Sequence, residues 1–144
     1  MIAAIVITFV LFGLCGAVHY VVMSALFKYL ANSKLTQGLR LQLGLIGVAT
    51  AHIFETGLYA VGFTIGQRAE LGSFKGIDAP MTLMDTFYFS LVNYTSLGLG
   101  DIYPTGHLRF IAGAESLNGF LLISCSAAFL FMLMQGKSPQ NTGY

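Results

Sequence analysis

Charged residues are scarce in this sequence. Lys, Arg, Asp and Glu make up 9% of its 144 residues, against about 25% in typical globular proteins. Hydrophobic residues make up 56%. A soluble domain of this length has to cover a large surface with polar groups, and so few charged residues cannot do that. The composition therefore excludes an ordinary soluble domain and predicts a protein of the lipid bilayer.

Other features that are missing narrow the possible functions. The net charge is only +1 and no block of like charge occurs, so we expect no nucleic-acid partner. There are two cysteines, Cys15 and Cys125, and both fall within apolar stretches. They resemble neither a disulfide framework nor a pair of metal ligands, and we expect them to pack as small apolar residues without a bound cofactor.

Three long apolar stretches cover residues 1–27, 41–67 and 110–136. Each exceeds the roughly 20 helical residues that cross a hydrocarbon core. The first carries no charged residue, and the others carry only Glu55 and Glu115. We therefore predict an all-α membrane protein with three transmembrane helices.

A fourth apolar segment, residues 83–94, is too short to span. Its roughly 12 residues make about 18 Å of helix, which is typical of a re-entrant or interfacial helix. Thr82 and Asp85 have the spacing of a capping box at its start. We predict a short helix that enters the membrane without crossing it.

The connecting loops predict the orientation. Lys28, Lys34 and Arg40 lie between the first two spans with no acidic residue among them, which favours the cytoplasmic side. The N-terminus and residues 68–107 are then outside, and residues 137–144 form a cytoplasmic tail. We expect a multi-pass protein of the cell membrane.

An alternating glycine pattern follows the short segment, in Thr95, Ser96, Leu97, Gly98, Leu99, Gly100 and Asp101. Glycine adopts positive φ without a Cβ penalty, and alternating backbone conformations let successive carbonyls point the same way. Irregular backbone at membrane depth is tolerated only where protein buries it or where it lines a watery cavity. Several such strands around an axis would replace the hydration shell of a cation with rings of oxygen, and the Ser96 hydroxyl would add one more ring.

Residues 96–101 resemble the Thr-Val-Gly-Tyr-Gly-Asp signature of potassium channels, and Thr95 matches a hydroxyl residue that usually precedes it. Residues 87–91 resemble the pore helix of that family, and residues 114–119 resemble the start of its inner helix. The whole chain resembles small prokaryotic proteins of the two-transmembrane, pore-loop ion channel superfamily that carry an extra N-terminal span.

This resemblance implies a domain organisation. Residues 1–40 would form an N-terminal transmembrane helix and a cytoplasmic loop, and residues 41–136 would form a pore domain. The pore domain would consist of an outer helix at 41–67, a pore helix at 83–94, a selectivity filter at 95–101 and an inner helix at 108–136. One chain supplies one pore loop, so a ring of carbonyls requires a homotetramer.

The resemblance also implies roles for particular residues. Potassium ions would bind the backbone carbonyls of Ser96, Leu97, Gly98 and Leu99 and the Ser96 hydroxyl. Leu99 replaces the tyrosine of the signature, so we expect the filter to rely on apolar contact with Phe87, Tyr88 or Phe89. Gly119 lies near a hinge glycine of the family, although close helix packing is the commoner use of small residues in membranes.

Ionisable residues inside spans are costly and often functional. His52 and Glu55 share one helix face, which Tyr59 continues, and His19 lies at similar depth in the first span. Three interpretations are open: a structural hydrogen-bonded cluster, a proton- or metal-sensing site, and haem ligation by His19 and His52. For Glu115 we expect either a polar brace to the pore-loop backbone or a pairing with His52 or Glu55.

The function that follows is a tetrameric, potassium-selective channel for monovalent cations, with no enzymatic activity. The alternatives are a non-selective monovalent cation channel, a membrane haem or redox protein that uses His19 and His52, and a non-conducting relative that acts as a subunit.

Overall fold

The computed structural model describes residues 1–77 and 80–135. In chain order the elements are α1 (Ile2–Asn32), α2 (Gln37–Arg68), β1 (Phe74–Lys75), α3 (Leu83–Tyr94), β2 (Tyr103–Pro104) and α4 (Leu108–Met134). Within the described residues, α1, α2 and α4 are long and apolar enough to cross a membrane. This confirms the three predicted spans.

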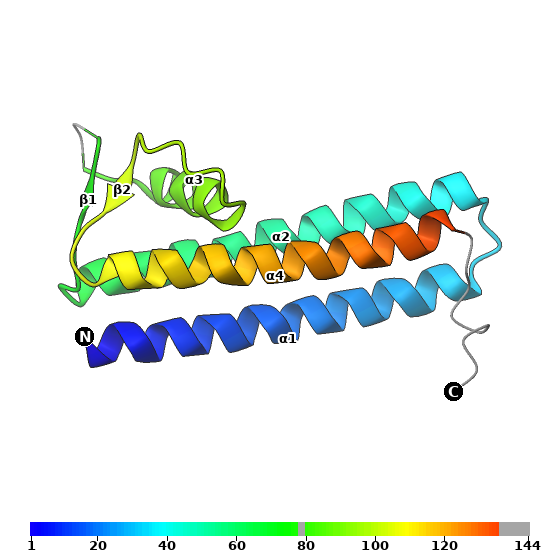
Figure 1. The fold of residues 1–144 in the computed structure, drawn as a ribbon, viewed down its shortest axis with the longest axis horizontal. Coiled ribbons are helices and arrows are strands. Elements are labelled where there is room, and N and C mark those ends of the chain that lie inside the picture. The colour runs from blue at the N-terminus through cyan, green and yellow to red at the C-terminus, as the bar shows by residue number, and fades with distance from the viewer. Residues whose placement is uncertain (78–79, 136–144) are drawn as a thin grey trace.

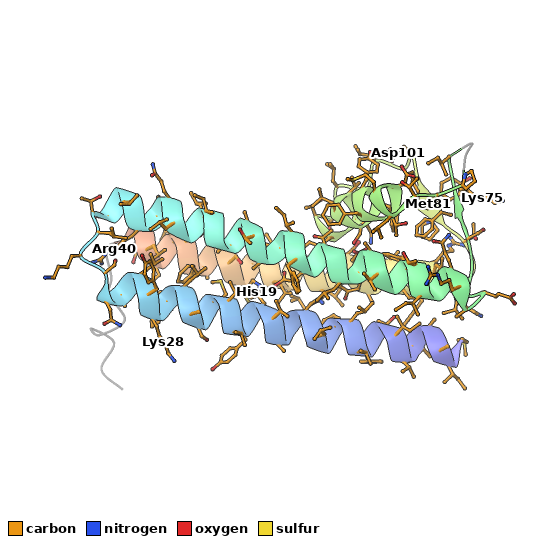
Figure 2. All side chains as sticks on the ribbon, turned by 180° about the vertical axis from the view of Figure 1, so that it is seen from behind. His19, Lys28, Arg40, Lys75, Met81 and Asp101 are labelled. Carbon is orange, nitrogen blue, oxygen red and sulfur yellow. The ribbon has the colours of Figure 1, made fainter. Side chains whose placement is uncertain are left out.

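The three long helices lie side by side, and α3 packs over one end of α2 and α4 (Figure 1). The N-terminus lies at the end of the bundle that carries α3, and the link from α1 to α2 lies at the opposite end. Figure 2 shows Lys28 and Arg40 at that opposite end, and Lys75 and Asp101 at the α3 end. The side of the membrane that each end faces remains a prediction.

Helix ends differ from the expected boundaries at the first connection. The link between α1 and α2 is only residues 33–36, because the helices extend through Lys28 and Arg40. These side chains interrupt an apolar stretch but are good helix formers. Arg40 also donates a hydrogen bond of 2.5 Å from Nη2 to the Ser33 carbonyl, which closes the link. The predicted tail, 137–144, and residue 136 lie outside the described residues.

Helix α3 has the predicted bounds, and its capping box is present. The Thr82 hydroxyl accepts the Asp85 N–H at 3.2 Å, and the Asp85 carboxylate accepts the Thr82 N–H at 2.8 Å. Strands β1 and β2 form an antiparallel pair that the sequence pattern did not predict, since two residues are too few for a periodicity. The pair joins the segment before α3 to the segment after the glycine-rich loop.

Aromatic packing fixes α3 on the bundle. Phe89 on α3 is buried, and its ring lies edge-on to those of Phe63 on α2 and Phe74 on β1, with centroids 5.2 and 4.8 Å away. Cys15 is buried in the same core, as expected of a packing residue. Cys125, by contrast, is exposed on α4.

Candidate functional site

The loop after α3 alternates its backbone conformation. Ser96, Gly98 and Gly100 have φ of 59°, 56° and 78°, whereas Leu97 and Leu99 do not have positive φ. The pattern predicted positive φ for the two glycines and did not predict it for Ser96. Because a side chain in this region costs on the order of 1–3 kcal/mol, the rest of the structure has to hold Ser96 in place.

Backbone N–H groups of the loop turn back toward α3. Ser96 N–H donates to the Asn93 carbonyl at 2.9 Å, and the N–H groups of Leu97 and Gly98 both donate to the Val92 carbonyl, at 3.1 and 3.3 Å. Among the described residues, no group donates a hydrogen bond to any carbonyl of residues 95–100. These carbonyl oxygens therefore have no backbone donor in that part of the chain.

Tyr88 holds the far end of the loop to α3. Its hydroxyl donates to the Asp101 carboxylate at 2.7 Å, and this hydrogen bond keeps the pKa of Asp101 below its usual value. Of the three side chains expected as alternative supports of the filter, Phe89 packs on Phe63 and Phe74 in the core behind α3. Phe87 lines an apolar groove beside α2. Successive helical residues turn by about 100°, so these three neighbours cannot all face the loop.

Glu115 joins α4 to α3 and is completely buried. One carboxyl oxygen is hydrogen-bonded to the Ser90 hydroxyl, and the other accepts the Asn93 side-chain amide at 2.6 Å. We expected Glu115 to bind the backbone of the pore loop, and it binds these two side chains instead. The N–H groups at the start of the loop are already bound to carbonyls of α3. Among the described residues, Glu115 makes no hydrogen bond with His52 or Glu55, which removes the predicted pairing.

A second buried carboxylate, Glu55, lies at the junction of three helices. Its oxygens are 2.9 Å from His19 Nδ1 on α1 and 3.0 Å from His52 Nδ1 on α2. The hydroxyl of Tyr94, the last residue of α3, donates to Glu55 at 2.5 Å. Figure 2 places His19 at mid-length in the bundle. We call His19, His52, Glu55, Tyr94 and Ser126 the histidine cluster.

Ser126 on α4 completes the histidine cluster. Its hydroxyl lies 3.0 Å from His52 Nε2 and 3.4 Å from His19 Nε2. The two rings are only 5.3 Å apart between centroids. A haem iron would need the two imidazoles on opposite faces of its macrocycle, and here one hydroxyl bridges them. The geometry therefore supports the docking interpretation over haem ligation.

Donor atoms of His19, His52 and Glu55 lie within 4.8 Å of one another. Imidazole and carboxylate are ligands that suit divalent transition metals, so the metal-sensing interpretation stays open on donor type and spacing.

We expected Tyr59 to lie with His52 and Glu55, but it lies outside the histidine cluster. Its side chain reaches past Glu55 to α4, where its hydroxyl accepts the Asn118 amide at 3.0 Å. Sequence reasoning also did not place Tyr94 and Ser126 in the cluster. Their partners lie on other helices, so no local spacing could have revealed them.

Gly119 lies where α4 meets the end of α3. A Cβ at this position would lie 2.0 Å from the Tyr94 carbonyl oxygen. The glycine thus allows the close approach of the two helices. Its role as a hinge remains a prediction.

A family model described as an ion channel matches residues 48–136, the part of the chain that contains most of α2, all of α3, the glycine-rich loop and α4. The chain belongs to this ion channel family. Comparison with curated proteins and with solved structures gives no match. The family and the apolar helices indicate an ion channel of multi-pass membrane topology, which transports ions. Helix α1 lies outside the matched region, yet it contributes His19 to the histidine cluster of the channel.

Proposed function

We propose that four copies of this chain assemble into a potassium-selective channel for monovalent cations, with residues 95–101 as its selectivity filter. Potassium ions bind the carbonyl oxygens of Ser96, Leu97, Gly98 and Leu99 and the Ser96 hydroxyl. The observation that carries this proposal is the alternating φ at Ser96, Gly98 and Gly100. Because the neighbouring N–H groups are bound to α3, the carbonyls are left to replace the water around a cation.

Exposure of the loop supports the need for several copies. All six residues from 95 to 100 are exposed in the single chain, and Leu97 and Leu99 are 64% and 58% exposed. Irregular backbone at membrane depth requires protein around it or a water-filled cavity beside it. A four-fold ring provides both, since each loop faces the axis on one side and its neighbours on the other.

Charge at the ends of the bundle supports the proposed orientation. The end formed by the α1–α2 connection carries Lys28, Lys34 and Arg40, which the positive-inside rule places in the cytoplasm. The filter and the N-terminus then face the outside of the cell membrane.

A non-selective monovalent cation channel is the second candidate. Leu99 favours it, because leucine has no hydroxyl that could fix the filter to its surroundings by a hydrogen bond. Separate potassium and sodium flux measurements distinguish the two candidates.

Flux through liposomes that contain only the purified chain tests the proposed pore. A Cβ at Gly98 or Gly100 would meet nothing within 4 Å in the single chain, so Gly98→Ala and Gly100→Ala act mainly through the positive φ, at about 1–2 kcal/mol each. We expect both variants to insert normally and to lose selective potassium flux.

Gly13→Ala on α1 is the matched control, since its Cβ also meets nothing within 4 Å and its backbone is helical. It should conduct like the wild type. Unchanged potassium flux and selectivity in both filter variants would contradict the assignment of the filter.

A further inference from the structure

The histidine cluster has no part in the proposed ion coordination, yet it contains Tyr94, the residue that directly precedes the filter. Tyr94 ends α3, and Thr95 begins the loop. The Tyr94 hydroxyl is bound to Glu55, and its carbonyl packs against Gly119 on α4. The position of the loop at its α3 end therefore depends on Glu55.

Hydrogen positions in the cluster follow from what each group can donate. An ionised carboxylate only accepts hydrogen bonds. Glu55 faces His19 Nδ1, His52 Nδ1 and the Tyr94 hydroxyl, and that hydroxyl also lies 3.1 Å from His52 Nδ1. The single Tyr94 hydrogen goes to Glu55 at 2.5 Å, so it is not available to His52. Both Nδ1 atoms must then carry a hydrogen, and this fixes the orientation of both rings.

The other nitrogen of each ring faces one shared hydroxyl. Ser126 has a single hydrogen and lies 3.0 Å from His52 Nε2 and 3.4 Å from His19 Nε2. It can donate to one Nε2 and accept from the other only if that second Nε2 carries a hydrogen. Every polar atom has a partner when one of the two rings is an imidazolium.

Charge balance agrees with one shared proton. The ion pairs found among the described residues are those of Glu55 with His19 and His52. One imidazolium neutralises the Glu55 carboxylate, which burial would otherwise penalise heavily. A divalent cation on the same donors would leave a net positive charge in an apolar bundle.

Other titratable groups near the cluster come from each packed helix. Cys15 on α1 contacts the Glu55 carbonyl at 3.8 Å, and Tyr59 lies one turn beyond Glu55 on α2. On α3 the titratable group is Tyr94 of the cluster itself, and Glu115 on α4 is bound to Ser90 and Asn93. Lys28 and Arg40 lie at the far end of the bundle (Figure 2), so the imidazoles supply the balancing charge.

We infer that Tyr94 positions the filter through Glu55, and that one proton shared by His19 and His52 keeps this chain of contacts intact. This inference rests on the proposed function and names a regulation of the same site. Loss of the proton at alkaline pH leaves Glu55 without a positive partner and Ser126 with one hydrogen for two bare nitrogens. The anchor of Tyr94 then weakens and conduction falls. Helix α1 becomes part of the control of the filter.

The first arm of the test counts the proton directly. Nitrogen NMR of ¹⁵N-histidine in the full chain, in liposomes with a chelator present, distinguishes neutral imidazole from imidazolium. His107→Gln removes the signals of the histidine outside the cluster. We expect one imidazolium per chain at neutral pH, shared between His19 and His52 and lost on alkalinisation, and none in Glu55→Gln. Two neutral or two charged rings at neutral pH would overturn the inference.

The second arm measures potassium flux against pH in the same liposomes. As the pH is raised, wild-type flux should fall, and the midpoint of this pH step should equal the pH at which half of the imidazolium signal is lost. Tyr94→Phe keeps the ring and removes the hydroxyl, so its imidazolium should persist while its flux no longer follows that midpoint. Glu55→Gln should also lose the pH step. Tyr20→Phe, an exposed tyrosine on α1, is the matched control and should retain it.

A wild-type pH step in both Tyr94→Phe and Glu55→Gln would overturn the positioning role, with thermal unfolding showing whether each variant is folded. If the wild type passes no potassium at any pH, the proposed function fails and the link to conduction fails with it. The NMR count is independent of conduction and alone decides the shared proton in that case.

Discussion

Glu115 has to satisfy two neighbours with one carboxyl group. The Ser90 hydroxyl has one hydrogen and faces two acceptors, the Thr56 carbonyl at 2.8 Å and the Glu115 carboxyl. A proton on Glu115 would donate to Ser90 and leave the Ser90 hydrogen for Thr56. Asn93 satisfies the other carboxyl oxygen. Glu115 thus joins α4 to two residues of α3, and Ser90 extends this contact to α2, so both the length and the hydrogen-bonding groups of Glu115 matter.

Substitution of Glu115 separates these contributions. Glu115→Gln keeps the length, its carbonyl accepts from Asn93 and its N–H donates to Ser90, so stability should stay near the wild-type value. Glu115→Ala leaves buried polar groups without partners, each at about 1–3 kcal/mol, and should lower the thermal unfolding temperature of the detergent-solubilised protein clearly. Equal unfolding temperatures for the two variants would contradict the brace.

At the scale of the helices, the sequence predicts a helix correctly where a single local signal determines its position. Apolar length gave the three spans, and the capping box of Thr82 and Asp85 marked the start of α3. The link between the first two spans is shorter than predicted, only residues 33–36. A charged residue ends an apolar run in the sequence without ending the helix. The face of each α3 residue was not predictable, since Phe89 turns to the core and Tyr88 to Asp101 only once α3 lies on α2.

The candidate site follows the same division. Its glycine positions and the buried ionisable residues could be read from the sequence, and their partners could not. Tyr94 and Ser126 bind histidines on other helices, and Tyr59 turns to Asn118 instead of Glu55. Such contacts depend on how the helices cross, which residue spacing along one helix does not encode.

The contact between α3 and α4 can be tested through Gly119. A Cβ there would lie 2.0 Å from the Tyr94 carbonyl oxygen, and backbone cannot yield as a side chain can. Gly119→Ala should cost about 1–3 kcal/mol, the usual range for overpacking, and should reduce flux by displacing the end of α3. Gly113→Ala, on the same helix with nothing within 4 Å of its Cβ, serves as control. A Gly119→Ala protein as stable and active as Gly113→Ala would refute the close approach.

On the scale of the whole molecule, the bundle combines the region matched by the ion channel family with the additional helix α1. The family match covers residues 48–136, and α1 packs against α2 and α4 of that part. The N-terminus lies at the end of the bundle where the loop is held (Figure 1). Because the basic connection lies at the opposite end, we predict that the N-terminus and the loop face the outside of the cell. The exposed loop predicts an assembly of four copies.

Assembly and topology can be measured together on tagged protein. Native mass spectrometry in mild detergent should give four chains per particle. A protease added outside intact cells should remove an N-terminal tag and leave a C-terminal tag. A stable monomer or dimer would contradict the four-fold pore, and protection of the N-terminal tag would contradict the orientation.

Selective conduction is the central claim, and the reversal potential tests it most directly. The purified chain is placed in a planar bilayer with potassium on one side and sodium on the other at equal concentration. Because the loop offers carbonyl oxygens at Ser96, Leu97, Gly98 and Leu99, we predict a current whose reversal potential is shifted strongly in the direction set by potassium permeation. A current that reverses at zero would show a pore that does not select potassium, and no current from a correctly inserted tetramer would contradict the channel itself.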